Sequence, residues 1–258
     1  MNYIDVEDID RDELAIYHQL RDNAFRIDNS FIADSPKVVN LILQTDIEIK
    51  SILATQEYYD EFKELLYHKN ISFLYVVKKE EMQKIVGHKI HHNCMLHGIR
   101  PNQTALENLD DKIIMLDSIT STENIGSIAR SAVALGVNSY LTPYNSPHPY
   151  SRRSLRVSMG YMSKLKYHIY KDIFQTIAEL KIAGYKIFAA EVTKDAINLQ
   201  DVVVPQKWVI LMGHEGEGLS QEIIDCCDTS VVIEMAKDVK SFNVGVAASI
   251  LMYKFCND

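Results

Sequence analysis

Apolar residues recur in short blocks along the first hundred positions, and each block has the length of one helix or one strand. Blocks with helical spacing, or with a helix-start signal such as Ser35-Pro36, predict helices over residues 8–27, 37–43, 57–68 and 79–86. Shorter apolar runs predict strands over residues 31–33, 49–54 and 72–77. Helices and strands alternate, which is typical of an α/β unit.

The alternating pattern stops over residues 98–111, which lack apolar periodicity and contain Pro101. Such a stretch indicates a domain boundary, so we expect two domains, residues 1–109 and residues 110–258. Beyond it, apolar runs predict strands over residues 113–116, 139–141, 165–170, 186–190, 208–212 and 230–233. Helical spacing predicts helices over residues 124–135, 152–159, 172–183, 219–225 and 243–255. Alternation again predicts an α/β fold.

Three polar or glycine-rich loops stand directly before apolar helical repeats in this second half. They are residues 124–130 (NIGSIAR), 212–220 (MGHEGEGLS) and 241–248 (SFNVGVAA). In α/β proteins, ligands bind where helices begin at the carboxyl ends of sheet strands. The three loops are therefore expected to converge on one ligand.

The middle loop holds three of the chain's ten glycines within residues 213–218, so a ligand can approach its backbone closely. A nucleotide-binding P-loop is excluded because Leu219 stands where the phosphate-binding Lys is required. A dinucleotide fingerprint matches poorly, since the glycine order is G-x-x-G-x-G, although Glu234 lies at a suitable distance for a ribose contact.

The same three loops resemble the motifs of the SpoU/TrmH branch of the SPOUT methyltransferases, over residues 110–258. That family transfers a methyl group from S-adenosylmethionine to a ribose 2′-hydroxyl of RNA. The resemblance implies a parallel sheet with a trefoil knot, and a homodimer in which Arg130 serves the partner's pocket. Segments such as FIADSPKVVNLIL and FLYVVKKEEMQKIVG resemble the family's small ribosomal-protein-like substrate-binding domain. An accessory domain for dimerisation or stability remains the alternative.

The resemblance also assigns residues to the site. It implies catalytic roles for Asn124, Arg130, Glu215, Ser241 and Asn243. It implies cofactor contacts for Met212, Gly213, Gly218, Ile233, Met235, Phe242 and Asn243. Taken alone, Asn124, Ser241 and Asn243 could simply cap helices. Arg130 suits phosphate orientation better than proton abstraction, because a guanidinium is hard to deprotonate and binds phosphate bidentately.

The chain departs from the family pattern at four positions. His214 replaces the usual Asn, Glu234 replaces Pro, Phe242 replaces Leu, and Gly245 replaces Ser. We interpret His214 as a buried imidazole satisfied by backbone groups rather than as a catalytic base. Gly245 removes a hydroxyl near the expected cofactor site.

Charge limits the partners that the chain can have. The formal net charge of −8 argues against a protein that coats nucleic acid. A local stripe from Arg152 to Lys171 nevertheless has six basic residues and no acidic one. Within it, Arg156-Val-Ser158-Met-Gly160 resembles a further family element. We expect RNA phosphate contacts from Arg152, Arg153 and Arg156, with a solvated face as the alternative.

Metal and membrane binding are not expected. His88, His91, His92, Cys94 and His97 form only one side of a zinc cage, and their segment matches the strand-like end of the accessory domain. Four cysteines give no disulfide framework. No apolar run reaches the roughly 20 residues of a membrane span. The acidic first residues are unlike a secretory or transit peptide, so we expect a cytoplasmic protein.

The expected function is transfer of a methyl group from S-adenosylmethionine to a ribose 2′-hydroxyl of structured RNA. Ribosomal RNA is the preferred substrate because of the accessory domain, and transfer RNA is next. Two alternatives stay open at this point: an RNA base methyltransferase of the same fold, and an RNA-binding protein without turnover.

Overall fold

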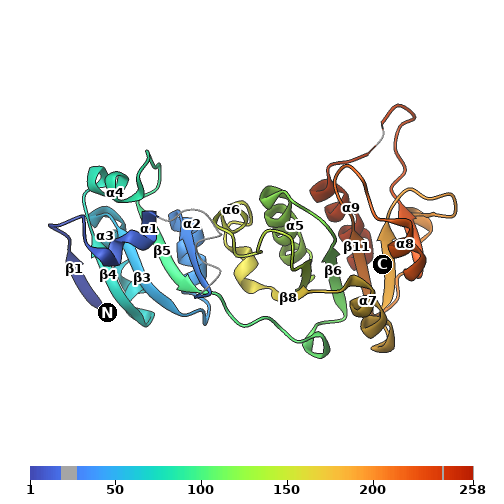
Figure 1. Cartoon of the computed structure of the whole chain (residues 1–258), viewed down its shortest axis with the longest axis horizontal. Helices are drawn as coiled ribbons and strands as arrows, with labels where there is room; N and C mark the ends of the chain where they lie inside the picture. Colours follow the sequence, from blue (N-terminus) through green and yellow to red (C-terminus); the bar gives the residue numbers. More distant parts are fainter. Residues whose placement is uncertain (19–27, 240, 258) are drawn as a thin grey trace. The chain divides into compact units, whose positions relative to one another are not determined.

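The computed structural model describes residues 1–18, 28–239 and 241–257. The chain forms two compact units (Figure 1). The first unit comprises Met1–Asn102 with Tyr150–Ser163, and the second comprises Gln103–Pro149 with Lys164–Asp258. No helix among the described residues has the length and apolar character needed to cross a membrane.

The first unit is built on a five-stranded sheet of order β1-β4-β3-β5-β2. Its strands are β1 (Asn2–Asp5), β2 (Ser30–Asp34), β3 (Ile49–Ala54), β4 (Ile71–Val76) and β5 (Cys94–Ile99). Strand β5 is antiparallel to both neighbours, and the other pairs are parallel. The sequence predicted most of these strands. Strand β1 was missed because it is a largely exposed four-residue edge strand with no continuous apolar run.

The helices of the first unit follow the predicted alternation. They are η1 (Asp12–Leu14), α1 (Ala15–His18), α2 (Pro36–Leu43), α3 (Gln56–His68), α4 (Lys79–Val86) and α6 (Arg152–Val157). A helix was predicted over residues 8–27, but helical structure begins only at Asp12. Residues 19–27 of that prediction lie outside the described residues. Helix α2 starts at Pro36, as the Ser35-Pro36 signal indicated.

Helix α6 and its flanks belong to the first unit although they lie between two segments of the second. The ring of Tyr150 packs edge-on against Phe31 of β2 at a centroid distance of 5.4 Å. Gly160, at φ +86°, lies so close to α2 that a Cβ there would be 3.1 Å from Leu41 Cδ2. The expected division at residue 109 placed this segment with residues 110–258, and its packing differs from that expectation.

The second unit is built on a fully parallel seven-stranded sheet of order β10-β12-β9-β11-β6-β7-β8. Its strands are β6 (Lys112–Leu116), β7 (Ser139–Pro143), β8 (Lys166–Tyr170), β9 (Lys186–Ala190), β10 (Ile197–Asn198), β11 (Trp208–Met212) and β12 (Thr229–Val232). Strand β11 is central and buried along its whole length, which explains its uninterrupted apolar sequence.

The helices of the second unit are α5 (Thr122–Ala134), α7 (Ile173–Ile182), α8 (Gln221–Cys226) and α9 (Val244–Asn257), with short 3₁₀ turns η3 (Leu106–Asn108) and η5 (Leu199–Asp201). The turn η4 (Tyr161–Lys164) lies in the first unit except for its last residue. Helix α9 returns to the sheet, where Phe255 packs edge-on against Trp208 of β11 and Phe188 of β9 at 5.3 and 4.9 Å between ring centroids. Helices α5 and α9 pack against each other. The loops after β9, β11 and β12 therefore share one edge of the sheet.

Candidate functional site

A pocket of about 520 Å³ lies at the carboxyl ends of β9, β11 and β12 in the second unit. Residues 190–192, 212–218, 231–233 and 235 contribute to its wall, together with the start of α9 and the loop before it. Of the residues expected to hold a cofactor, those that line it are Met212, Gly213, Gly218, Ile233, Met235 and Phe242. Ser241 lines it as well. The volume falls within the range of small-molecule sites.

The glycine-rich loop doubles back on itself at Gly213. His214 and Gly218 exchange backbone hydrogen bonds, His214 N to Gly218 O at 3.2 Å and Gly218 N to His214 O at 2.9 Å. A Cβ at residue 213 would lie 2.6 Å from the carbonyl carbon of Gly218, so only glycine fits there. This tight turn forms one wall of the pocket.

His214 stabilises the turn through its ring. Its Nδ1 accepts hydrogen bonds from the backbone N–H groups of Gly216 and Glu217 at 3.1 and 3.2 Å. The imidazole is half-buried rather than buried, and backbone groups satisfy it as expected. An asparagine oxygen at this position can accept such bonds too, so the replacement preserves the type of contact.

Three polar side chains from separate loops meet in a chain of hydrogen bonds. Asn243 Nδ2 donates to Asn124 Oδ1 at 3.2 Å, and Asn124 Nδ2 donates to Glu215 Oε1. The residues are up to 119 positions apart in the sequence. The structure therefore brings together Asn124, Glu215 and Asn243, three of the five side chains to which the resemblance gave catalytic roles.

The two asparagines differ in their capping role. Helix α5 starts at Thr122, and Ser121 is its cap, because Ser121 Oγ accepts from Asn124 N at 3.2 Å. The expected helix start at Asn124 was two residues late, and the Asn124 side chain is not the cap. Asn243 Oδ1 does cap α9, since it accepts from Gly245 N at 2.9 Å, while its amide nitrogen reaches Asn124.

Arg130 lies on the exposed side of α5. Among the residues that the structure describes, its side chain has no hydrogen bond or ion pair. Its guanidinium is therefore available to a ligand or to another molecule.

Gly245 is explained by the packing of α5 against α9. A Cβ at residue 245 would lie 2.5 Å from Ser127 Oγ and 3.2 Å from Asn243 Oδ1. Ser127 Oγ is held in this place by a 3.1 Å hydrogen bond to Asn124 O. A hydroxyl from α5 thus occupies the space that a side chain on α9 would take.

The charged groups that line the pocket are all acidic. They are Glu191, Glu215 and Glu217, and no Lys or Arg lines it among the described residues. Such a lining favours a cationic ligand and disfavours phosphate. Glu234 does not line the pocket and instead accepts from Asn198 Nδ2 at 3.3 Å, so the dinucleotide interpretation has no support.

Sequence reasoning missed Glu191 and its neighbours Ala190 and Val192. The available signal was positional, because Glu191 directly follows strand residues 186–190, and a polar side chain at the carboxyl end of a parallel strand faces the ligand edge.

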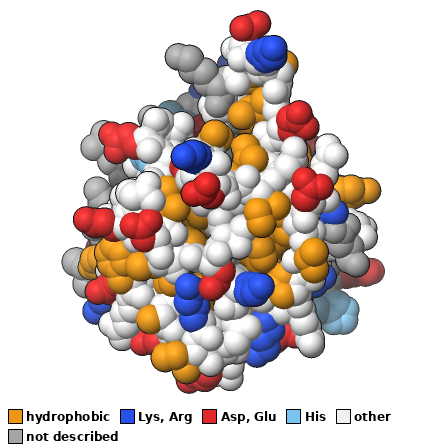
Figure 2. Space-filling view, turned by 90° about the vertical axis from the view of Figure 1, so that its right-hand side faces the viewer, with side chains coloured by type: hydrophobic (Ala, Val, Ile, Leu, Met, Phe, Trp, Pro, Cys, Tyr) orange, Lys and Arg blue, Asp and Glu red, His pale blue; other side chains and the backbone are white. Residues whose placement is uncertain are grey.

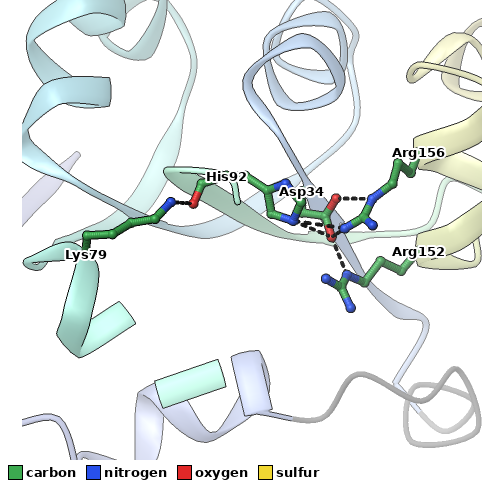
Figure 3. A network of polar contacts seen from close by, with 5 residues as sticks. All are labelled: Asp34, Lys79, His92, Arg152 and Arg156. Carbon is green, nitrogen blue, oxygen red and sulfur yellow. Dashed lines mark hydrogen bonds and ion pairs between the residues drawn. The ribbon is translucent and has the colours of Figure 1, made fainter. Parts of the chain in front are cut away.

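The predicted RNA-binding arginines lie in the first unit, and two of them bind a buried carboxylate (Figure 3). Arg156 contacts Asp34 through two nitrogens, Nε to Oδ1 at 2.8 Å and a terminal nitrogen to Oδ2 at 2.6 Å. Arg152 Nε also donates to Asp34 Oδ2, and Asp34 has no exposed side-chain area. We call Asp34, His92, Arg152 and Arg156 the Asp34 network.

The Asp34 network determines the ionisation of its members. Burial by itself would raise the pKa of Asp34, but the Arg156 hydrogen bond and the charges of Arg152 and Arg156 hold that pKa below its usual value. Burial lowers the pKa of His92, against the pull of Asp34. A neutral His92 ring suits its 2.9 Å contact, in which Arg156 is the donor.

Among the described residues, no group of three or more His, Cys, Asp or Glu side chains could hold a metal ion. Within the histidine-rich segment, His92 contacts Arg156, and His97 Nε2 lies 2.9 Å from Ser30 Oγ. Figure 2 shows one face of the molecule, on which acidic and basic side chains are interspersed with hydrophobic patches rather than gathered into one basic field.

The fold and pocket define an α/β protein with a ligand site at the carboxyl edge of a parallel sheet. Residues 111–253 match the SpoU rRNA Methylase family, so the chain belongs to that family. A relative from Staphylococcus haemolyticus, named "Putative TrmH family tRNA/rRNA methyltransferase", is 32% identical over 142 residues, which are 55% of this chain and 57% of the relative. A relative of the same name from Staphylococcus epidermidis matches to the same extent. The match thus spans little more than half of these curated relatives.

Solved structures resemble nearly the whole chain. The AdoMet-bound rRNA methyltransferase of Sinorhizobium meliloti has a TM-score of 0.86 at 18% identity, over 98% of this chain and 97% of that one. The SpoU methyltransferase AviRb of Streptomyces viridochromogenes, in complex with AdoMet, has a TM-score of 0.82 at 21% identity, over 95% and 98%. The shared α/β fold therefore includes the first unit. The family and the α/β fold expected from the sequence are both confirmed.

Proposed function

We propose that this protein transfers a methyl group from S-adenosylmethionine to a ribose 2′-hydroxyl of RNA. The observation that carries the proposal is the acidic pocket whose loop meets Asn124 and Asn243 through Glu215. Membership of the SpoU rRNA Methylase family supports methyl transfer. The AdoMet complexes of two proteins with this fold support the choice of donor.

The residues present fit this cofactor. Backbone groups of Met212, Gly213 and Gly218 and the apolar side chains of Ile233, Met235 and Phe242 would hold it. The cofactor supplies an electrophilic methyl group on a positively charged sulfur. Carboxylates at the wall complement that positive charge, whereas a phosphate ligand would meet no cation among the described lining residues.

The polar chain from Asn243 to Glu215 would orient the ribose. Each amide group is fixed by its neighbour, so Asn124 and Asn243 present defined donors and acceptors at the α5 and α9 entrances. Arg130 would bind an RNA phosphate and position the sugar, because an exposed guanidinium suits bidentate phosphate contact. With the ribose held in this way, the cofactor would supply its methyl group to the 2′ oxygen, and the hydroxyl proton would pass to water.

We further infer that the first unit is the RNA-docking domain, with ribosomal RNA as the preferred substrate and transfer RNA next. The rRNA methyltransferase of known structure shares this unit's fold as well as that of the second. Arg152, Arg153 and Arg156 remain our predicted phosphate contacts. Arg156 retains about a third of its side-chain exposure beside Asp34. Such substrates imply a cytoplasmic site of action.

We also infer a trefoil knot and a homodimer. The knot is supported by strand order, since β12 lies beyond β9 and the chain then returns to pack α9 on α5 and β11. The dimer is supported by an exposed apolar face of α9, where Val246 and Tyr253, seven residues apart, are 48% and 63% exposed. Arg130 would then serve the pocket of the partner subunit.

Two measurements test the proposed function. Titration calorimetry with S-adenosylmethionine should detect binding in the micromolar range, and total absence of binding would favour an RNA-binding protein without turnover. RNA from a deletion strain should lack one nuclease-resistant dinucleotide that the purified protein restores. A restored modified base with an unmodified ribose would instead assign a base methyltransferase.

A further inference from the structure

Glu191 is fixed at the wall of the pocket by two backbone groups. Its Oε2 accepts from Leu219 N at 2.9 Å, and its Oε1 accepts from Val192 N at 3.1 Å. The first contact joins the loop after β9 to the end of the glycine-rich loop after β11. Because each carboxylate oxygen accepts only one of these bonds, each keeps capacity for further interaction.

Gly218 is packed directly against this carboxylate. Its φ of +70° lies in the left-handed region, and a Cβ at residue 218 would collide with Oε2 of Glu191. The left-handed backbone favours glycine at the end of the loop, and a side chain there would also displace the Glu191 carboxylate. The two residues together determine where the loop ends and α8 begins.

Glu191 is the pocket carboxylate best placed to act on a ligand. Glu215 is bound to Asn124, and Glu217 is exposed at the tip of the loop. Glu191 is half-buried and held by the backbone, so its charge has a fixed position in a pocket without a lining cation among the described residues. A fixed charge interacts with a ligand without the cost of ordering its own side chain.

We propose that Glu191 makes the pocket discriminate between the positively charged methyl donor and its neutral thioether product, S-adenosylhomocysteine. The inference rests on the proposed function. Methyl transfer converts a sulfonium into a thioether, so the reacting sulfur loses its positive charge while the rest of the molecule is unchanged. A fixed carboxylate attracts the positive charge of the bound donor, but it has no such attraction for the neutral thioether. The product is therefore bound more weakly, which assists its release. Glu191 is thus a specificity-determining residue that also positions the loop.

The test is titration calorimetry of three ligands with wild type and Glu191→Gln. The glutamine oxygen can still accept from Leu219 N, whereas its NH2 group cannot accept from Val192 N, and the charge is gone. We expect the Kd for S-adenosylmethionine to rise about fivefold relative to the Kd for S-adenosylhomocysteine, the effect of one partly exposed ion pair. Sinefungin, which has an ammonium group in place of the sulfonium, should weaken together with the donor. Glu222→Gln, at an exposed carboxylate on α8 that does not line the pocket, is the matched control and should leave the ratio unchanged.

Equal weakening of all three ligands would overturn the inference, because it would mean that Glu191 only holds the loop. Glu191→Asp provides a second arm that does not depend on the glutamine variant being well folded. The shorter aspartate keeps the charge but withdraws from Leu219 N. We therefore expect the affinities for S-adenosylmethionine and S-adenosylhomocysteine both to fall, while the ratio of their Kd values stays near that of the wild type. Loss of the preference for S-adenosylmethionine in this variant would contradict the proposal. If wild type binds none of the ligands, the proposed function itself fails. If wild type binds them but substitutions of Glu191 leave the ratio of the two Kd values unchanged, only this inference fails.

Discussion

Single side chains in the site carry two contacts each, which couples local stability to ligand geometry. Asn243 caps α9 with its oxygen and reaches Asn124 with its nitrogen. His214 closes the glycine-rich loop with one ring nitrogen that accepts two backbone bonds. Glu191 holds Leu219 N while it lines the pocket. Substitutions that keep one contact and remove the other therefore separate folding from function.

Asn243→Ser is such a substitution. A serine hydroxyl can cap α9 but cannot reach Asn124, so the melting temperature should change little while methyl transfer falls at least about tenfold. Asn243→Ala also removes the cap and should cost about 1 kcal/mol of stability. Thermal melting and methyl transfer to RNA measure the two effects. Full transfer by the serine variant would remove Asn243 from the ribose site.

Arg130→Ala tests the role of the exposed arginine. We expect methyl transfer to be abolished while S-adenosylmethionine affinity stays at the wild-type value, because Arg130 does not line the pocket. Arg130→Lys should recover little, since an ammonium lacks the bidentate geometry of guanidinium. Lys186→Ala, an exposed cation at the opposite end of β9, is the control. Retained transfer in Arg130→Ala would refute the assigned role.

At the scale of elements, helices α5 and α9 are the rigid supports of the site. Their close approach at Ser127 and Gly245 sets the distance between Asn124 and Asn243. The start of α5 at Thr122, with Ser121 as its cap, leaves the Asn124 side chain inside the first turn and free to bond across to Glu215.

Gly245→Ala should destabilise the second unit by about 1 kcal/mol, because the new methyl group displaces Ser127 Oγ from its bond to Asn124 O. Adding Ser127→Ala removes that oxygen and should restore most of the lost stability. Denaturant unfolding of the two single variants and the double variant measures the coupling. Additive effects would show that the two helices do not compete for this space.

At the scale of the whole molecule, the two units are not two continuous stretches of chain. Residues 150–163 cross from the second unit into the first, where the Asp34 network and the Tyr150 ring hold them. The basic stripe seen in the sequence is thus partly neutralised by a carboxylate 118 residues earlier. Any RNA contact by these arginines depends on the integrity of that network.

Asp34→Asn should destabilise the first unit by about 3 kcal/mol at pH 7, because two arginines lose their buried counter-charge. The folded pKa of Asp34 is lowered, so its contribution is complete above the ordinary value of about 3.9 and is lost as the pH falls through the lower folded pKa. Hydrogen exchange in β2 and α6 should show the defect at pH 7. Urea unfolding should show the wild-type advantage shrinking below about pH 4.

Asp110→Asn is the control for this effect. Its ion pair with Lys166 is exposed on both sides, so its removal should cost less than about 1 kcal/mol at any pH. An Asp34→Asn variant that behaves like this control would show that the network does not hold residues 150–163 in place.

Most elements could be predicted because helical spacing and buried strands are local properties of a sequence. Strand β11 is recognisable from Val209 to Met212 because both faces of a parallel sheet are covered. Strand β1 could not be recognised in this way, because an exposed edge strand has no continuous run of apolar residues. The family resemblance supplied the site residues of the three loops, and the structure places most of them around one pocket.

The sequence by itself determined the alternation of helices and strands, the two loops that enter α5 and α9, and the glycine turn at Gly213. These depend on residues close together in the chain. Only the tertiary structure decided that β9 lies between β11 and β12, which brings Glu191 against Gly218, and that Asp34 binds Arg152 and Arg156. Strand order and long-range ion pairs depend on how separate elements bury their apolar faces together, and no local spacing records that choice.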